Sequence, residues 1–263
     1  MTHPEVFPEK KEKPFRVLRV GIDLDDTFFR IAIPSLEILN RKFSTNFTTE
    51  DIEEFWYVTA FLKQLGVAEK EIESFRDEVY RSLDDKYGVY RNSPPISGAI
   101  EVLNGICRVG HQPFVLTSRP PGLERIVEEQ FRAVGIDWIA GDWANGGNIL
   151  IRDSEYWEKM SSEKFKITAI AGKFTFGKYQ GFPGLEAHLD DMGELIGHPL
   201  IAGFPKIRDK IFILAQEHNV KITPKENLVS NWWVFYKVIR CLARGEDLSW
   251  LTSHNVDTEF IEV

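Results

Sequence analysis

The chain has little cysteine, no long apolar run and no excess of basic residues. Cys107 and Cys241 lie far apart on apolar helical patterns, so we expect buried thiols in a cytoplasmic protein rather than a disulfide framework. No apolar run reaches the roughly 18 residues of a membrane span, which argues against a membrane partner. The net charge of -8 argues against a long nucleic-acid footprint, because such binding needs clustered Lys and Arg, but it is compatible with a small anionic substrate.

Hydrophobic patterning divides the 263 residues into tails, a core and a helical insertion. The N-terminal segment is polar and interrupted by proline, and it lacks the apolar middle of a secretory signal, so we expect a flexible tail there. One buried strand is followed by about sixty residues with only helical spacing, after which strands and helices alternate. The expected units are an N-terminal tail at 1–15, a core domain at 16–30 and 94–245, a helical cap at 31–93, and a C-terminal tail at 246–263.

The same patterns give approximate bounds for the individual elements. Helices are expected at 34–43, 49–65, 68–85, 97–109, 122–134, 167–173, 207–218 and 231–243. Strands are expected at 17–24, 113–117, 186–191 and 220–222, with 138–140 and 148–151 as alternatives for one more strand. Together these elements predict an α/β protein with a parallel sheet flanked by helices.

The most informative stretch is the apolar strand that ends in three carboxylates and a threonine, within residues 16–27. Asp23 and Asp25 follow directly after the apolar residues, and ligands bind at the carboxyl edge of an open α/β sheet. At an effective dielectric of about 20, two carboxylates about 5 Å apart repel each other by about 3 kcal/mol. A divalent metal ion is therefore the natural companion of this site.

Other interpretations of these acids are weaker. A chain with 40 acidic residues contains Asp-x-Asp by chance, usually in solvated loops. A calcium-binding loop counted from Asp23 would have Phe28 where glycine is needed and Pro34 where glutamate is needed. A receiver-type signalling domain also carries acids after its first strand, but the spacing of the later polar residues argues against it.

Polar residues also stand at the ends of later strands and at the start of a helix. Thr117 and Ser118 end one strand, Lys166 opens a helix, and Asp190 and Asp191 end another strand. Such a set can transfer a phosphoryl group by covalent catalysis. One carboxylate attacks phosphorus, a second acid protonates the leaving oxygen and later activates water, and cations with hydroxyl donors stabilise the phosphoryl charge.

Together these stretches resemble the four motifs of the haloacid dehalogenase (HAD) superfamily of phosphatases. The matching stretches are, in motif order, Asp23-Leu-Asp-Asp-Thr27, Phe114-Val-Leu-Thr117, Lys166 and Asp190-Asp191. The resemblance implies a HAD-like Rossmannoid core with a small helical cap inserted after the first strand. It also implies Mg²⁺ as the cofactor and hydrolysis through an aspartyl-phosphate intermediate.

The resemblance further implies roles for individual residues. Asp23 would be the nucleophile, and Asp25 would be the acid/base that also offers its carbonyl oxygen to the metal. The implied metal ligands are Asp23, Asp25, Asp190 and Asp191, and the implied phosphate ligands are Thr117, Ser118 and Lys166. Lys166 is favoured because it begins a short apolar helix, with Lys164, Lys173 and Lys178 as alternatives. Asp26 stands where glycine is common in the superfamily and receives no role.

Three further stretches are similar to the 5′(3′)-deoxyribonucleotidases (5′-nucleotidase C type) within the superfamily. They are Pro95-Ile-Ser-Gly-Ala-Ile-Glu101, Leu116-Thr-Ser-Arg-Pro120 and Asn231-Trp-Trp-Val234. This similarity implies a nucleoside monophosphate as the small phosphorylated substrate, and a homodimer is left open. The alternatives are a phosphatase for another small phosphoester or for a nucleic-acid end, and a non-catalytic HAD-fold binding or regulatory protein.

Substrate contacts are expected from the cap and from the residue after the second motif. Phe29 and Trp56 are the preferred candidates for stacking on a nucleobase, although aromatic residues there can equally form the core between the cap and the main domain. Arg119 could reach a phosphate or ribose, or pair with a surface acid. His188 shares a strand face with Asp190 and is expected to pack there or to support that acid.

Overall fold

The computed structural model describes residues 15–216 and 218–253, and it is built around one parallel sheet. The sheet has six strands in the order β3-β2-β1-β4-β5-β6. Their bounds are β1 (Arg19–Ile22), β2 (Gln112–Thr117), β3 (Ile149–Ile151), β4 (Ala187–Asp190), β5 (Ile211–Leu214) and β6 (Leu228–Val229). Every neighbouring pair is parallel, which confirms the predicted α/β fold with a parallel sheet.

The strand β1 lies at the centre of the sheet, between β2 and β4. Its last residue, Ile22, is in register with Val115 on one side and Leu189 on the other. A Cβ on Gly21 would lie 2.3 Å from the Leu185 side chain, so only glycine fits this position without a rearrangement. Because all strands run in the same direction, the residues that follow β1, β2 and β4 meet at one edge of the sheet.

Helices cover both faces of the sheet and enclose two hydrophobic clusters. The first face is covered by α4 (Ala99–Arg108), α5 (Glu124–Ala133) and α10 (Trp232–Arg244). The second face is covered by α7 (Ser162–Ala171), α8 (Glu194–Gly197) and α9 (Pro205–Arg208). In β2, Val115 belongs to the first cluster and Leu116 to the second, as the alternation of side chains along a strand requires.

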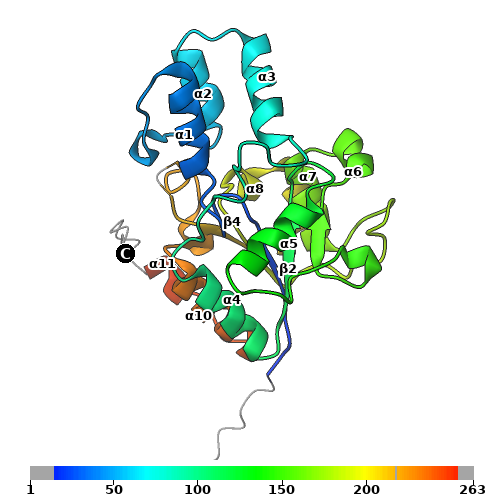
Figure 1. Cartoon of the computed structure of the whole chain (residues 1–263). Helices are drawn as coiled ribbons and strands as arrows, with labels where there is room; N and C mark the ends of the chain where they lie inside the picture. Colours follow the sequence, from blue (N-terminus) through cyan, green and yellow to red (C-terminus); the bar gives the residue numbers. More distant parts are fainter. Residues whose placement is uncertain (1–14, 217, 254–263) are drawn as a thin grey trace, which may run out of the picture.

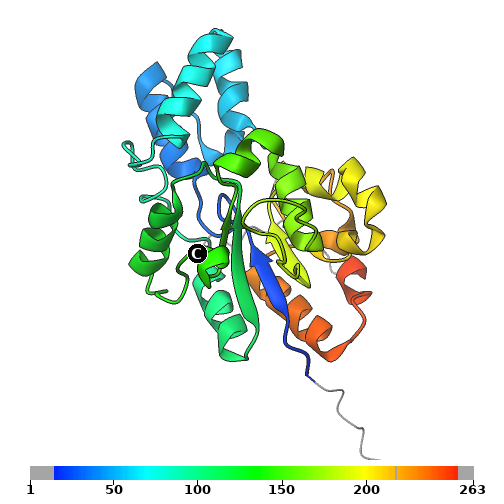
Figure 2. The ribbon, with the colours of Figure 1, turned by 90° about the vertical axis from the view of Figure 1, so that its right-hand side faces the viewer.

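The helical insertion stands beyond the carboxyl edge of the sheet, as Figures 1 and 2 show. It contains α1 (Ala32–Phe43), the short 3-10 helix η1 (Thr49–Asp51), α2 (Tyr57–Gln64) and α3 (Glu69–Tyr80). Leu39, Leu62 and Phe75 from the three α-helices are buried and join the first hydrophobic cluster. The cap and the core therefore share one continuous apolar interior. We found no helix in the described ranges that is long and apolar enough to cross a membrane.

Several predicted elements differ from the structure. The helix expected at 49–65 is divided, because the Asp51 side chain accepts a 2.8 Å hydrogen bond from the Thr48 backbone and the chain is extended at Ile52 before α2 begins. The prediction of a helix at 207–218 is wrong, since Ile211–Leu214 forms β5 and is buried on both faces. Such a short apolar run does not show whether its hydrophobic residues repeat with the period of a helix or with that of a strand.

The remaining corrections concern short segments. Residues 220–222 form a turn rather than a strand, and β6 lies further on at Leu228–Val229. Of the alternatives for the strand after α5, 148–151 is the one that matches β3. The expected C-terminal tail begins with the ordered helix α11 (Trp250–Ser253), whose Leu251 is buried. Most of the expected N-terminal tail and the last ten residues of the expected C-terminal tail, 1–14 and 254–263, lie outside the described residues.

Candidate active site at the carboxyl edge of the sheet

Asp23, the first acid after β1, is fixed by a buried lysine. Its backbone N–H donates to the Leu189 carbonyl oxygen at 2.9 Å, which extends the pairing of β1 with β4 by one residue. Lys166 on α7 places its Nζ 2.9 Å from Asp23 Oδ1 and 2.8 Å from Asp190 Oδ2. Burial lowers the pKa of Lys166, but Asp190 and Asp23 together raise it well above its ordinary value. Lys166 is therefore a permanent cation that bridges two acids.

Asp190 holds this lysine and is itself held by other donors. Its Oδ2 lies 2.8 Å from His188 Nε2, and its Oδ1 accepts a 3.0 Å hydrogen bond from the Met192 backbone. Burial alone would raise the pKa of Asp190. Lys166 and His188 outweigh this effect and lower the pKa to about 2. Asp190 is therefore an anionic anchor for Lys166. The supporting contact expected for His188 is the hydrogen bond that it makes here.

Asp191 is the next acid along the chain, and its carboxylate lines the cavity. Thr27 donates a 3.3 Å hydrogen bond to its Oδ1, and Asn219 donates to its backbone oxygen at 2.8 Å. Burial raises the pKa of Asp191 well above its ordinary value, and the neighbouring charges of Asp190 and Asp23 raise it further. Burial raises the pKa of Asp23 to about 7, helped by the charges of Asp190 and Asp25 and opposed by Lys166.

These three acids could hold a metal ion. Asp23, Asp190 and Asp191 each offer an oxygen within 4.8 Å of the others, and all three residues are buried. Three carboxylates meet here, and Lys166 contacts two of them, Asp23 and Asp190. A donor set made only of carboxylate oxygens fits a hard divalent cation such as Mg²⁺. Asp190 contributes least, because Lys166, His188 and the Met192 backbone already contact its oxygens.

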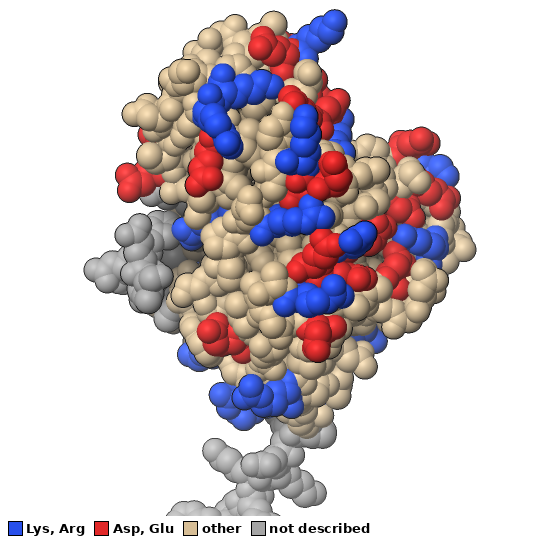
Figure 3. Space-filling model, in the orientation of Figure 1, with Lys and Arg blue, Asp and Glu red and all other residues tan. Residues whose placement is uncertain are grey.

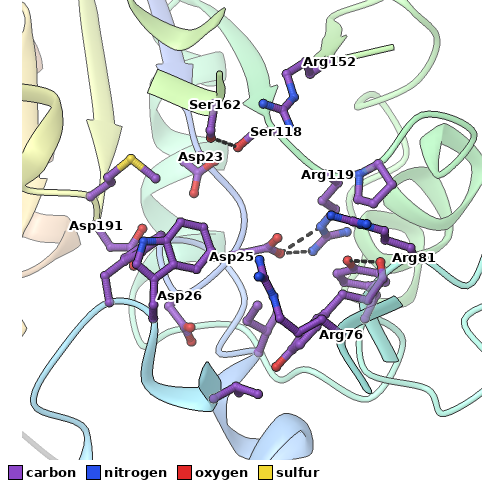
Figure 4. Close-up of a pocket in the computed structure, with 18 of the residues that line it drawn as sticks. Asp23, Asp25, Asp26, Arg76, Arg81, Ser118, Arg119, Arg152, Ser162 and Asp191 are labelled. Carbon is purple, nitrogen blue, oxygen red and sulfur yellow. Dashed lines mark hydrogen bonds and ion pairs between the residues drawn. The ribbon is translucent and has the colours of Figure 1, made fainter. Parts of the chain in front are cut away.

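The Asp25 carboxylate lies outside this cluster and points toward Arg119 (Figure 4). Arg119 donates from Nε at 2.8 Å and from Nη2 at 2.6 Å, and both bonds end on Asp25 Oδ1. Arg119 Nη1 also donates to Gln130 Oε1 at 2.5 Å. The guanidinium lies 4.2 Å from the centroid of the Tyr90 ring. Arg119 thus pairs with an acid of the site itself rather than with the surface acid that was the expected alternative.

The two predicted hydroxyl groups after β2 are placed differently. Ser118 lines the cavity and shares a 2.5 Å hydrogen bond with Ser162, at the start of α7 (Figure 4). The Thr117 side chain is buried, and its hydroxyl accepts a 3.3 Å hydrogen bond from the Arg119 backbone. As a phosphate ligand Thr117 is therefore less well placed than Ser118, because its hydroxyl supports the turn after β2.

Asp26 has a structural role that the sequence did not indicate. Its backbone is in the left-handed region, with φ of 53°, which acidic residues and asparagine adopt more readily than most. Its Oδ1 accepts a 3.0 Å hydrogen bond from the backbone N–H of Ala32, the first residue of α1. Asp26 therefore joins the loop after β1 to the beginning of the cap.

A cavity of about 260 Å³ lies between the cap and the sheet edge. The core contributes Asp23, Asp25, Ser118, Arg119, Arg152, Trp157, Ser162, Lys166 and Asp191, and the cap contributes Trp56, Tyr57, Arg76, Tyr80 and Arg81. Of the four lysines considered as phosphate ligands, Lys166 is the one that lines it. Lys178 instead pairs with Asp142 at 2.5 Å and with Asp153 at 3.2 Å.

The two aromatic candidates for substrate stacking have different surroundings. Trp56 lines the cavity and is 52% exposed. Phe29 is 1% exposed and packs edge-on against Phe28 and Phe131 in the hydrophobic core. The expectation that Phe29 contacts substrate is therefore wrong, because the turn after β1 directs its ring into the interior.

Sequence reasoning missed the arginines and the second tryptophan of the cavity wall. Arg76 and Arg81 resembled ordinary charges on a solvated helix, because nothing in their spacing shows that α3 overhangs the sheet. Arg152 and Trp157 lie in a segment that is longer than expected for a compact nucleotidase. The sequence could have indicated Arg152 in one way, because it directly follows the end of a predicted strand, where site residues are expected.

The comparisons with known proteins identify the fold. No protein-family model matches the chain, and no curated protein matches it in sequence. A HAD family hydrolase from Deinococcus radiodurans, solved with bound phosphate and sodium, aligns with a TM-score of 0.50 at 13% identity over 87% of this chain and 97% of that one. A haloacid dehalogenase-like hydrolase from Streptococcus pneumoniae aligns with a TM-score of 0.51 at 11% identity over 84% and 98%. The chain has the fold of the HAD-like hydrolases.

Proposed function

We propose that this chain is a metal-dependent phosphatase that hydrolyses a small phosphomonoester through an aspartyl-phosphate intermediate. The observation that carries the proposal is the contact between Asp23 and Lys166, next to Asp191, at the floor of a cavity covered by the cap. A nucleophile, a fixed cation and an acidic metal site are the parts that phosphoryl transfer requires. The motif resemblance and the shared fold agree with this assignment.

Asp23 acts as the nucleophile. Lys166 holds its Oδ1, so Oδ2 attacks the phosphorus while the bond from phosphorus to the ester oxygen breaks. Asp25 gives a proton to the departing oxygen, then takes one from the water that hydrolyses the aspartyl-phosphate and releases inorganic phosphate. Lys166 and Ser118 face the phosphoryl oxygens. A divalent cation held by Asp23 and Asp191, when bound, supplies charge neutralisation for the acids and the phosphoryl group.

Arg119 is a positioning residue for this proton transfer. Both of its contacts with Asp25 end on Oδ1, so we assign Oδ2 to the proton that moves to and from the substrate. Trp56 and Tyr57 cover the other side of the cavity and exclude water from the reacting groups.

The substrate that we favour is a (deoxy)nucleoside monophosphate. The similarity of three stretches to the 5′(3′)-deoxyribonucleotidases supports it, and so does the exposed ring of Trp56 in the cavity wall, which can stack on a base. Acidic and basic side chains are interspersed on the face shown in Figure 3, which agrees with a small substrate rather than a long nucleic acid.

The test is a substrate panel measured with Mg²⁺. It contains nucleoside 5′- and 3′-monophosphates, sugar phosphates, a 5′-phosphorylated oligonucleotide and an aryl phosphate. We expect turnover by the wild type and none by Asp23→Asn, with the highest kcat/KM on a nucleotide. Equal inactivity of the two proteins across the whole panel would contradict the enzyme, and a sugar phosphate as the best substrate would contradict only the nucleotidase.

A further inference from the structure

The cavity has charges of opposite sign on its two sides. Asp23 and Asp191 lie on one side, whereas Arg81 and Arg152 lie on the other, as Figure 4 shows. The first side is accounted for by the metal and the phosphoryl group. The second side has no partner in the proposed reaction of a singly phosphorylated substrate.

Arg152, which follows β3, is the least satisfied of these cations. Its Nη1 donates to the Met160 carbonyl oxygen at 3.2 Å, but its Nε is buried without a hydrogen-bond partner. Within the described ranges it forms no ion pair with a carboxylate. Its guanidinium lies 3.9 Å from the centroid of the Trp157 ring. A buried donor without a partner costs about 1 to 3 kcal/mol, so the protein itself satisfies the Arg152 side chain poorly.

Arg81 brings a second positive charge from the cap to the same tryptophan. It follows α3, and its guanidinium lies 5.5 Å from the Trp157 ring centroid. It forms an ion pair with Asp77, which lies in the last turns of α3 and is exposed to solvent, and such pairs contribute little. Burial lowers the pKa of Arg152, and the charge of Arg81 lowers it further, although Glu163 opposes the effect. Two guanidinium groups that lie near one ring, line the same cavity and repel each other form a site for an anion.

We propose that the substrate carries a second anionic group, a phosphate or a carboxylate, and that Arg152 and Arg81 bind this group while Trp157 orients the two guanidinium groups. The inference rests on the proposed phosphatase, and it narrows the favoured nucleotide to one that carries an anionic group besides the scissile phosphate. Guanidinium groups match both anions, because their N–H donors form a planar fork. The scissile phosphoryl group then lies at Asp23 and the second anion at the junction of cap and core. Among nucleotides, a bisphosphate is preferred to a monophosphate.

The test compares matched substrates that differ by one anionic group. One pair is adenosine 5′-monophosphate with adenosine 3′,5′-bisphosphate, and the other is glycerol phosphate with 3-phosphoglycerate. We expect the wild type to prefer the doubly anionic member, and Arg152→Gln to reduce this preference, measured as the ratio of kcat/KM values, by about tenfold through KM. The pair with the larger preference identifies the second anion as phosphate or carboxylate.

The control is Arg125→Gln, which removes an arginine that is 86% exposed on α5 and should leave the preference unchanged. An equal loss on both members of each pair would overturn the inference, because Arg152 would then bind the transferred phosphoryl group. A wild type without preference would also overturn it. If no phosphomonoester is hydrolysed, the proposed function fails, and calorimetric binding of the same four compounds to wild type and Arg152→Gln decides the anion site alone.

Discussion

Arg119 and Asp25 lie 94 residues apart in the sequence and form an ion pair with two hydrogen bonds to one carboxylate oxygen. The Arg119 side chain is completely buried, whereas Asp25 is 29% exposed toward the cavity. The pair therefore connects an interior group, fixed by Gln130 and Tyr90, to a side chain that can reach substrate. In the proposed mechanism, proton transfer by Asp25 would depend on a residue whose side chain is not exposed to the substrate.

Replacing Arg119 tests this dependence. Arg119→Lys keeps the charge but loses the fork and the contact with Gln130, so we expect kcat to fall about tenfold or more with a smaller change in KM. Because a buried donor network is broken, the free energy of unfolding should fall by about 2 to 4 kcal/mol. Steady-state kinetics and urea unfolding measure the two effects. Unchanged kcat in a folded Arg119→Lys variant would exclude the positioning role.

Lys166 is expected to be essential for both folding and activity. Lys166→Met leaves Asp23 and Asp190 buried without their cation, which should lower the free energy of unfolding by about 3 kcal/mol or more. Activity should fall by at least about a hundredfold, because the nucleophile loses its orientation. Lys178→Gln is the matched control, since that lysine pairs with Asp142 and Asp153 away from the cavity, and it should retain kcat/KM.

Metal binding should be detectable without activity. Because Asp23, Asp190 and Asp191 offer carboxylate oxygens close to one another, Mg²⁺ should stabilise the native state, by about 2 to 3 kcal/mol at about a hundred times its dissociation constant. Thermal unfolding with Mg²⁺ and with a chelator measures this. Asp191→Asn should be more stable than the wild type without metal and should lose the Mg²⁺ response. Asp137→Asn, at an exposed position, should behave like the wild type.

Substitutions of Phe29 and Trp56 should have different effects, the first on stability and the second on substrate binding. Phe29→Ala opens a cavity in the core and should lower the free energy of unfolding by about 3 to 5 kcal/mol. Trp56→Ala removes a ring that is half exposed in the cavity wall, so we expect a small change in stability and a higher KM for nucleotides. If KM is unchanged in Trp56→Ala, the ring does not contact the substrate.

His111 should make stability depend on pH. Its Nδ1 accepts a 3.2 Å hydrogen bond from the Leu18 backbone, and burial lowers its pKa below 6.5. Between that lowered pKa and the ordinary value the unfolded chain binds more protons, so stability is complete above pH 6.5 and is lost as the pH falls below it. Urea unfolding at pH 7.5 and 5.5 measures this loss, which should be smaller in His111→Gln. An identical pH dependence of both proteins would exclude His111 as its source.

Much of the catalytic floor was predictable from the sequence, because residues after parallel strands must meet at one edge. Asp23 and Asp191 follow the neighbouring strands β1 and β4, and Lys166 lies beside Asp23. The expected helix at 167–173 begins earlier, at Ser162, so Lys166 lies in the second turn of α7 rather than at its start. The orientation of Asp25 was not predictable, since it depends on Arg119 and on the partners of Arg119. Phe29 and Trp56 also looked alike, because burial of an aromatic ring is decided by the packing of distant elements.

The cavity wall was less predictable than the floor. Arg81 reaches Trp157 only because α3 overhangs the sheet, and helical periodicity gives no information on the position of a helix relative to the core. The helix that was predicted where the structure has β5 has a different cause. Four consecutive apolar residues fit a buried strand and a buried helix equally well.

The hydrogen bond from Ala32 to Asp26 connects the beginning of the cap with the loop that carries Asp25. Asp26 is the direct neighbour of Asp25, and Ala32 begins the helix that leads to the rest of the cap. If the cap moves at this junction, the Asp25 loop would move with it. In the proposed mechanism, closure of the cap over a substrate would then also bring the proton donor into place.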